Sequence, residues 1–168
     1  MTAENTAENP LKPDGANPAE AVAEGVARTL ELARTWLAWD GVPVPAEDRI
    51  YTPNKALRRY ADHLVDHLAE IEALLAGVPT EPDHWHASAV TLGSDLAAFT
   101  EEDLNEADER LRRLARLYVL RFAAAGPQAW DASRHPNWTL REIAEHVAPA
   151  WYAEAVGDLS DQASPALG

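Results

Sequence analysis

Two histidines, His63 and His67, lie four residues apart in the stretch ADHLVDHLAEIEALL, where apolar and acidic residues make up the rest. Side chains at this spacing on a helix have Cβ atoms about 5–6 Å apart, so two imidazole nitrogens can converge on one metal ion. A third histidine, His146, lies in the last helical stretch of the chain. If the two helices face each other, the three imidazoles predict a divalent-metal site with an open position for water or a substrate.

Other roles for these histidines stay open. The apolar stripe of the helix that carries His63 and His67 consists of Leu57, Leu64, Leu68 and Leu75. This stripe places both histidines at the border of the core, where an imidazole is often solvated or hydrogen-bonded and binds no metal. In a cleft without an ion, the same side chains would serve as acid/base groups.

Carboxylate and aromatic side chains complete the candidate site. We assign catalytic roles to Glu70 and Glu145, either as general bases or as groups that orient the imidazoles by hydrogen bonds. Aromatic and histidine side chains are expected to line the cleft and contact the substrate. These residues are Tyr60, His84, Trp85, His86, Trp138, Trp151 and Tyr152.

Composition excludes several classes of function. The 168 residues include 14 Lys and Arg against 28 Asp and Glu, and a net charge of −14 disfavours nucleic acid as a partner. The absence of cysteine excludes thiolate nucleophiles and zinc–thiolate sites, so imidazoles and carboxylates would have to hold any metal. The first residues lack a signal-peptide pattern, and no window approaches the roughly 20 apolar residues of a membrane span. We therefore expect a cytoplasmic protein with no membrane partner.

Hydrophobic periodicity and capping residues predict four helices and no convincing strand. The predicted helices cover residues 18–40, 53–76, 100–125 and 139–157. Thr52, Thr100 and Thr139 provide N-caps for the last three. Four helices of this length predict an all-α four-helix bundle.

The bundle is expected to form one domain over residues 18–159. Residues 1–17 combine Pro, Gly, Asn and Glu with almost no large apolar side chain, so burial cannot repay the entropy of ordering them. They are predicted to be a disordered tail, and residues 160–168 a flexible C-terminal tail.

Two segments resemble a known family. The stretch NWTLREIAEHVA at residues 137–148, followed by Trp151 and Tyr152, resembles the tryptophan-led, histidine-ending helix of the DinB/YfiT-like superfamily. The stretch LVDHLAE at residues 64–70 is similar to the same kind of histidine helix. Together they cover roughly a quarter of the chain, within a helical plan that extends over most of it.

The resemblance implies a DinB-like four-helix bundle, often dimeric, in which His63, His67 and His146 hold a nickel or zinc ion. Known activities of the family include S-transferases that use mycothiol or bacillithiol, and the mycothiol-dependent maleylpyruvate isomerase. By this resemblance we expect a metal-dependent transferase, isomerase or hydrolase that acts on a small molecule. A thiol cofactor such as mycothiol and a homodimer are part of the same expectation.

The ligand pattern differs from that of the family. The family takes one histidine from the second helix and an HxxxH pair from the last, whereas here the pair is His63 and His67, and Ala150 lies four residues after His146. The alternative function is a metal-free DinB-like enzyme or binding protein, which acts on a natural-product-type molecule through histidine acid/base groups and an aromatic-lined cleft. A third interpretation is a bundle whose task is association, with Trp36 and Trp39 as core or dimer contacts.

Overall fold

The computed structural model describes residues 15–81 and 89–163, and the chain is mostly helical. The helices are α1 (Glu20–Thr35), α2 (Pro53–Ala76), α4 (Glu101–Ala125), α5 (Pro127–Trp130), α6 (Leu140–Val147) and α7 (Trp151–Val156). Within these two ranges, the short 3-10 turns η1 (Trp36–Ala38), η2 (Gly93–Leu96) and η3 (Ser160–Ala163) lie between or after the helices. The helical class predicted from the sequence is therefore confirmed, with the additions and corrections described below.

Threonine N-caps begin the three helices for which the sequence predicts them. The Thr52 hydroxyl accepts a hydrogen bond from the Lys55 backbone N–H (3.2 Å) at the start of α2. Thr100 at α4 and Thr139 at α6 each form a full capping box with the acidic residue three positions later. Because these signals are local in sequence, the start of each of these helices agrees with the prediction to within a residue.

A short antiparallel hairpin corrects the prediction that the chain has no strand. β1 (Val44–Ala46) pairs with β2 (Arg49–Tyr51), with Val44 opposite Tyr51, and the turn places Glu47 at a positive φ of 54°. Pro45 within β1 is tolerated because a two-stranded sheet consists only of edges. Strands of three residues are too short to show a period-two pattern, which is why the sequence analysis missed them.

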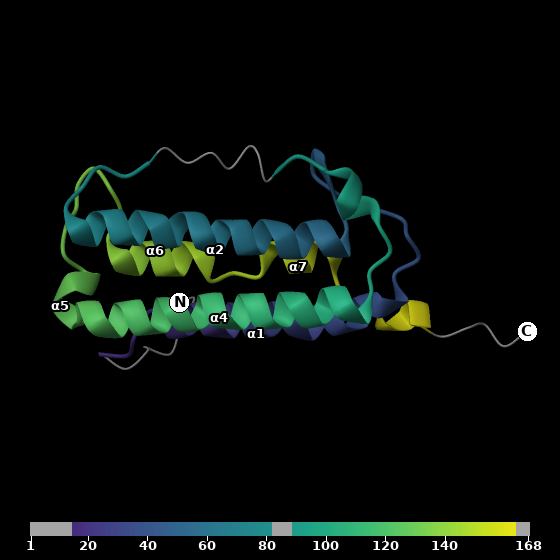
Figure 1. Ribbon diagram of the computed structural model, residues 1–168, viewed down its shortest axis with the longest axis horizontal. Coiled ribbons are helices and arrows are strands. Elements are labelled where there is room, and N and C mark those ends of the chain that lie inside the picture. Colours follow the sequence, from purple (N-terminus) through teal and green to yellow (C-terminus); the bar gives the residue numbers. More distant parts are fainter. Residues whose placement is uncertain (1–14, 82–88, 164–168) are drawn as a thin grey trace, which may run out of the picture.

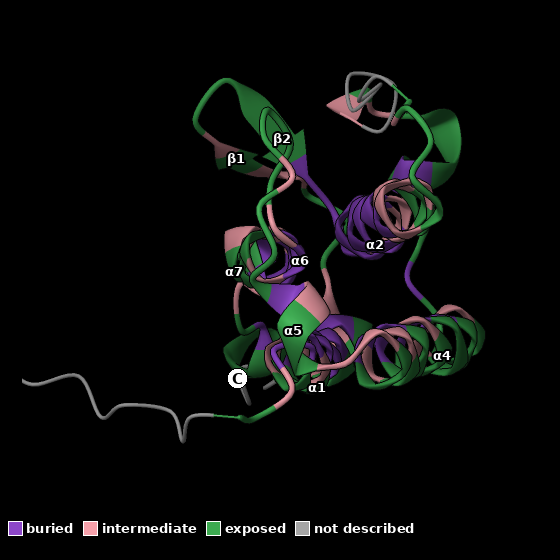
Figure 2. Ribbon diagram, turned by 90° about the vertical axis from the view of Figure 1, so that its left-hand side faces the viewer, coloured by how far each residue is buried: buried purple, intermediate pink, exposed green. Residues whose placement is uncertain are grey.

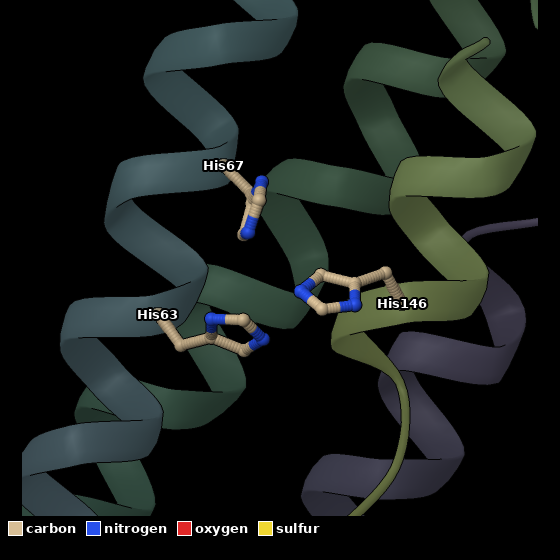
Figure 3. Close-up of side chains that lie close together, drawn as sticks. All are labelled: His63, His67 and His146. Carbon is tan, nitrogen blue, oxygen red and sulfur yellow. The ribbon is translucent and has the colours of Figure 1, made fainter. Parts of the chain in front are cut away.

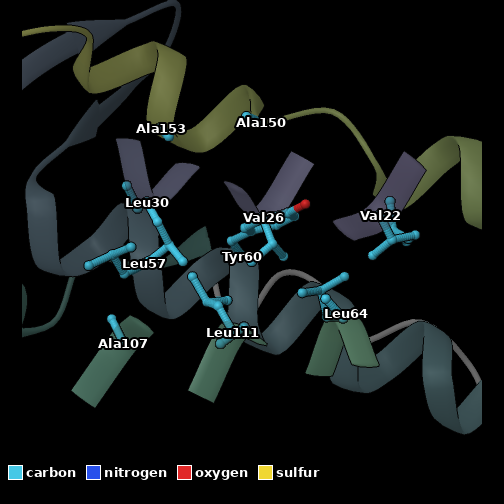
Figure 4. Packing of buried hydrophobic residues seen from close by; sticks show 14 of the residues in the cluster. Val22, Val26, Leu30, Leu57, Tyr60, Leu64, Ala107, Leu111, Ala150 and Ala153 are labelled. Carbon is cyan, nitrogen blue, oxygen red and sulfur yellow. The ribbon is translucent and has the colours of Figure 1, made fainter. Parts of the chain in front are cut away.

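The long helices α1, α2 and α4 run side by side with the shorter α6 and α7 (Figure 1). α1 packs against α4, while α2 packs against α4, α6 and α7. The end-on view shows buried positions turned toward the space that the helices share (Figure 2). Val26, Leu30, Tyr60, Leu64 and Leu111 are among the side chains that fill it (Figure 4). The Tyr118 hydroxyl donates to the Leu64 carbonyl at 2.7 Å, which joins α4 to α2 through a buried hydrogen bond.

The last predicted helix is broken in two. The sequence analysis expected one helix over residues 139–157, whereas α6 ends at Val147 and α7 begins at Trp151. Pro149 explains the break, since proline lacks a backbone N–H and its ring clashes with the preceding turn of a helix. The Ala148 carbonyl accepts a hydrogen bond from the Tyr60 hydroxyl (3.2 Å) at this break. The break therefore separates His146 from the residues of α7 and fixes the connecting segment on α2.

A buried ion pair holds η2 against the first turns of α2. Asp95 is 2% exposed and accepts hydrogen bonds from Arg58 Nε (3.0 Å) and Nη2 (2.7 Å). Burial alone would raise the pKa of Asp95, but the hydrogen bonds from Arg58 and from the Leu92 N–H hold that pKa below its ordinary value. This carboxylate is therefore ionised in the folded protein and contributes to positioning α2.

The last described residues pack near the end of α1. Leu159, at the predicted domain end, is buried, and η3, which lies in the segment assigned to the C-terminal tail, packs against η1. Nearby, Trp36 Nε1 donates to the Gly157 carbonyl at 2.7 Å. Residues 1–14 of the predicted N-terminal tail lie outside the described residues. None of the helices within the described residues has the length and apolar character needed to cross a bilayer.

Candidate metal centre

Three imidazoles from two helices meet at one point in the structure. His63 and His67 come from α2 and His146 from α6, and one ligand atom from each lies within 4.8 Å of the others. The centroid of the His63 ring lies 4.8 Å from that of the His67 ring and 4.9 Å from that of the His146 ring. Figure 3 shows the three rings directed into the same space between the helices. The convergence that the sequence predicts for these three histidines is present.

Both elements hold their histidines firmly. His63 and His67 share one face of α2 because residues four apart lie one above the other on a helix. His146 lies in the last turn of α6, where the fully buried Ile143 and Val147 fix the rotation of the helix. Because packed helices constrain both sides of the cluster, the positions of the imidazoles are set before any ligand binds.

The histidines are more deeply buried than their predicted position at the core border. His63 is 5% exposed and His67 is 7% exposed. Leu68 and Leu75, which the sequence analysis placed on the core stripe, are only partly buried. The reason is that α6 and α7 pack along the histidine side of α2 and move the centre of its buried face toward these residues.

Glu70 is placed to orient one of the imidazoles. Its Oε2 lies 2.7 Å from His67 Nδ1, one turn along α2. A carboxylate on Nδ1 fixes the ring orientation and directs Nε2 toward an ion, an arrangement common at metal-bound histidines. The second predicted carboxylate, Glu145, is exposed, and no contact with the three histidines is found for it among the described residues. The structure thus gives Glu70 an orienting contact and gives Glu145 none.

Aromatic side chains surround the histidine cluster. Trp138 and Trp151 lie 4.8 Å and 6.0 Å from the His146 ring, and they are 44% and 52% exposed. The Tyr152 ring lies 6.0 Å from that of His63. Three of the predicted substrate contacts therefore gather around the cluster, and the two tryptophans mark the side of it that faces solvent.

Tyr60, which the sequence analysis also expected to contact the substrate, lies in the core. Tyr60 is 1% exposed and belongs to the core, where burial raises the pKa of its phenol well above the ordinary value. His84, Trp85 and His86 lie outside the described residues. A core position for Tyr60 follows from its place on α2, since it faces Ala148 at the break between α6 and α7.

Two buried cations precede the histidines on the same face of α2, and the sequence analysis missed both. Lys55 is 1% exposed and Arg59 is 4% exposed. Lys55 Nζ donates to the Ile50 carbonyl and the Thr91 hydroxyl, both at 2.8 Å. Burial, and after it the charge of Arg59, lowers the pKa of Lys55. The sequence does carry a signal for their position. Lys55 and Arg59 precede His63 at the same four-residue spacing that separates His63 from His67.

The donor set fits a borderline divalent ion. Three imidazoles without thiolate suit zinc or nickel, while hard ions such as magnesium and calcium prefer oxygen ligands. Ligand nitrogens at about 2.0–2.1 Å from an ion lie about 3–4 Å from one another. The atoms offered here lie within 4.8 Å, so small side-chain rotations would bring all three to binding distance.

Acid should destabilise the metal-free protein through His63. Burial, followed by the charges of His67, His146 and Arg59, lowers the pKa of His63 from 6.5 to about 3. The unfolded chain takes up a proton on this residue as the pH falls below 6.5, whereas the folded chain takes up none until the pH nears 3. Acidification therefore favours unfolding, by up to about 1.4 kcal/mol per pH unit.

We expect His63→Gln to flatten this dependence between about pH 6.5 and pH 5, where most carboxylates are still ionised. Urea unfolding of the metal-free wild type and variant at several pH values measures the two slopes, whatever their absolute stabilities. Equal slopes would show that His63 does not titrate as described.

Similarity to known proteins does not assign this site. Comparison of the chain with protein-family models, with curated proteins and with solved structures finds no match in any of the three.

Proposed function

We propose that this chain is a DinB-like four-helix bundle in which His63, His67 and His146 bind one nickel or zinc ion. We further propose that it is a metal-dependent enzyme acting on a small molecule, of the transferase, isomerase or hydrolase type. The observation that carries the proposal is the meeting of three imidazoles from two helices within 4.8 Å. Bound there, such an ion would polarise a carbonyl or lower the pKa of a bound thiol or water.

The protein's own residues would prepare the site. The Glu70 carboxylate would accept a hydrogen bond from the Nδ1–H of His67, which leaves Nε2 as the nitrogen that faces the cluster. The depth of His63 and His67 keeps both rings out of bulk water. Ligands that are already oriented and desolvated lose little conformational freedom when they bind.

The aromatic side chains would bind the substrate. Trp138 and Trp151 present large apolar surfaces to solvent beside the half-buried His146. A ligand that covers these rings would gain apolar contact and would exclude water from the histidines at the same time. Substrate entry from the tryptophan side follows from their exposure.

The cluster leaves room for a further ligand. Among the described residues, the group that could hold an ion contains three side chains, and a tetrahedral site has four positions. Water, the substrate or a thiol would take the remaining position. Because the chain has no cysteine, a thiol would have to come from a cofactor, and mycothiol is the candidate that the family resemblance suggests.

Metal retention by the purified protein tests the proposal. We expect about one nickel or zinc ion per chain after dialysis, and a rise in melting temperature when either ion is added to stripped protein. An ion at 100 times its Kd stabilises a fold by about 2.7 kcal/mol. Magnesium and calcium serve as controls and should produce no shift. A protein that retains no ion and whose melting temperature does not respond to nickel or zinc would rule out the metal-dependent function.

A further inference from the structure

Arg59 is a buried cation for which the described part of the chain offers no acidic partner. The residue is 4% exposed, and among the described residues no carboxylate forms an ion pair with it. The neighbouring Arg58, by contrast, donates two hydrogen bonds to the Asp95 carboxylate. A buried guanidinium is normally paired, because desolvating a charge is costly. We take the lack of a paired carboxylate within the described residues as a sign that a ligand supplies one.

The hydrogen bonds of Arg59 leave one edge of its guanidinium for such a ligand. Nη1 donates to the Tyr51 hydroxyl at 2.6 Å, whereas Nε has no hydrogen-bond partner among the described residues. Nε and Nη2 together form an edge with two parallel N–H groups, and this edge matches the two oxygens of a carboxylate. A partner at this edge would satisfy a donor that is otherwise buried without an acceptor.

Arg59 is linked to the histidine cluster through one aromatic ring. Its guanidinium carbon lies 4.5 Å from the centre of the Tyr152 ring, and that ring lies 6.0 Å from the His63 ring. The Tyr51 ring lies on the guanidinium as well, at 5.8 Å. Stacking on aromatic faces holds the guanidinium in one orientation, and the buried Nε on its free edge has no hydrogen-bond partner among the described residues. One small molecule could therefore contact Arg59 and reach the histidines together.

We infer that Arg59 binds a carboxylate of the small molecule that reaches the histidine cluster, so that the substrates of this site are organic acids. The reaction at the histidines rests on the proposed function, whereas the carboxylate site rests on Arg59 alone. Lys55, one turn earlier on the same face of α2, adds a second buried positive charge that favours an anion.

Calorimetric titration of metal-free protein with succinate tests the inference. Metal-free protein is used because succinate could otherwise bind to a metal ion at the histidines. Such binding would give a signal that does not come from Arg59. We expect saturable binding of succinate by the wild type, with succinamide, its uncharged diamide, binding at least about tenfold more weakly. Inorganic phosphate is the second anion, and tighter binding of phosphate than of succinate would overturn the assignment to carboxylates.

Substitution of Arg59 is the second part of the succinate-binding test. Arg59→Gln should weaken succinate binding by about tenfold or more and leave succinamide binding unchanged, a selectivity that a purely structural arginine would not control. Arg28→Gln is the matched control, because Arg28 is exposed and pairs with Glu31 on α1. If Arg59→Gln does not fold, Arg59→Lys keeps the charge but loses the two-donor edge, and the same loss of succinate binding is expected.

The outcome separates this inference from the proposed function. Equal succinate binding by the wild type and the Arg59 variants, or none by the wild type, would overturn the carboxylate site even if nickel or zinc binds at the histidines. Conversely, succinate binding that depends on Arg59 would stand even if the protein holds no metal.

Discussion

Replacing His67 with alanine should lower the affinity for nickel or zinc by at least about 100-fold, because even the loss of a group that only orients a ligand typically costs 10–100-fold. The substitution removes one of three imidazoles and also the partner of Glu70. His146→Ala should have an effect of similar size, since His146 is the one ligand that a second helix provides among the described residues. Competition with a chromophoric chelator measures the affinities.

His135 provides the matched control for these substitutions. It is an exposed histidine outside the cluster, so His135→Ala should bind metal like the wild type. A far-ultraviolet dichroism spectrum of each variant separates loss of a ligand from loss of the fold, which matters most for the buried His67. Wild-type affinity in both His67→Ala and His146→Ala would contradict the site. If the protein holds no metal and these variants still lose activity, the histidines act as acid/base groups in a metal-free cleft.

Gly25→Ala should destabilise the fold by several kcal/mol. A Cβ at this position of α1 would lie 1.7 Å from the Ala148 carbonyl oxygen and 2.9 Å from the Tyr60 hydroxyl. Backbone atoms cannot turn aside as a flexible side chain can, so the segment between α6 and α7 would have to move. Without this contact, the same substitution in a helix interior would stabilise it by about 1 kcal/mol. A loss of stability in Gly25→Ala would therefore show that α1 lies in close contact with the Ala148 carbonyl.

The same substitution should weaken metal binding, because the displaced segment follows directly on the turn of α6 that carries His146. Gly93→Ala is the control, since an added Cβ there would meet nothing within 4 Å. Urea unfolding of both variants measures the change in the free energy of unfolding. A Gly25→Ala protein within about 0.5 kcal/mol of the wild type would show that α1 and the connecting segment are not in such close contact.

Local signals in the sequence were sufficient for the longest elements. The sequence places α2 at the same bounds as the structure, because Thr52 caps its start, Pro53 occupies its first position and Gly77 adopts a left-handed φ of 68° at its end. Pro149 is an equally local signal, but the predicted helix over residues 139–157 did not take it into account. The hairpin had no such signal, because its strands are too short to show a pattern.

The candidate site was predictable only in part. The meeting of His63, His67 and His146 follows from their spacing and from helices that face each other. Their depth does not, because it depends on which neighbours cover each side of α2. The burial of Lys55 and Arg59 could not be foreseen either, since such residues are mostly exposed and only packing by the hairpin and α7 places them inside.

The central claim, that three histidines hold one divalent ion, can be tested most directly by anomalous diffraction from crystals grown with nickel or zinc. Data collected above and below the absorption edge of the metal locate the ion without reference to activity. The account predicts one strong peak per chain, at about 2.0–2.1 Å from a nitrogen of each of His63, His67 and His146. A peak bound elsewhere, or no peak at the three histidines, would contradict it.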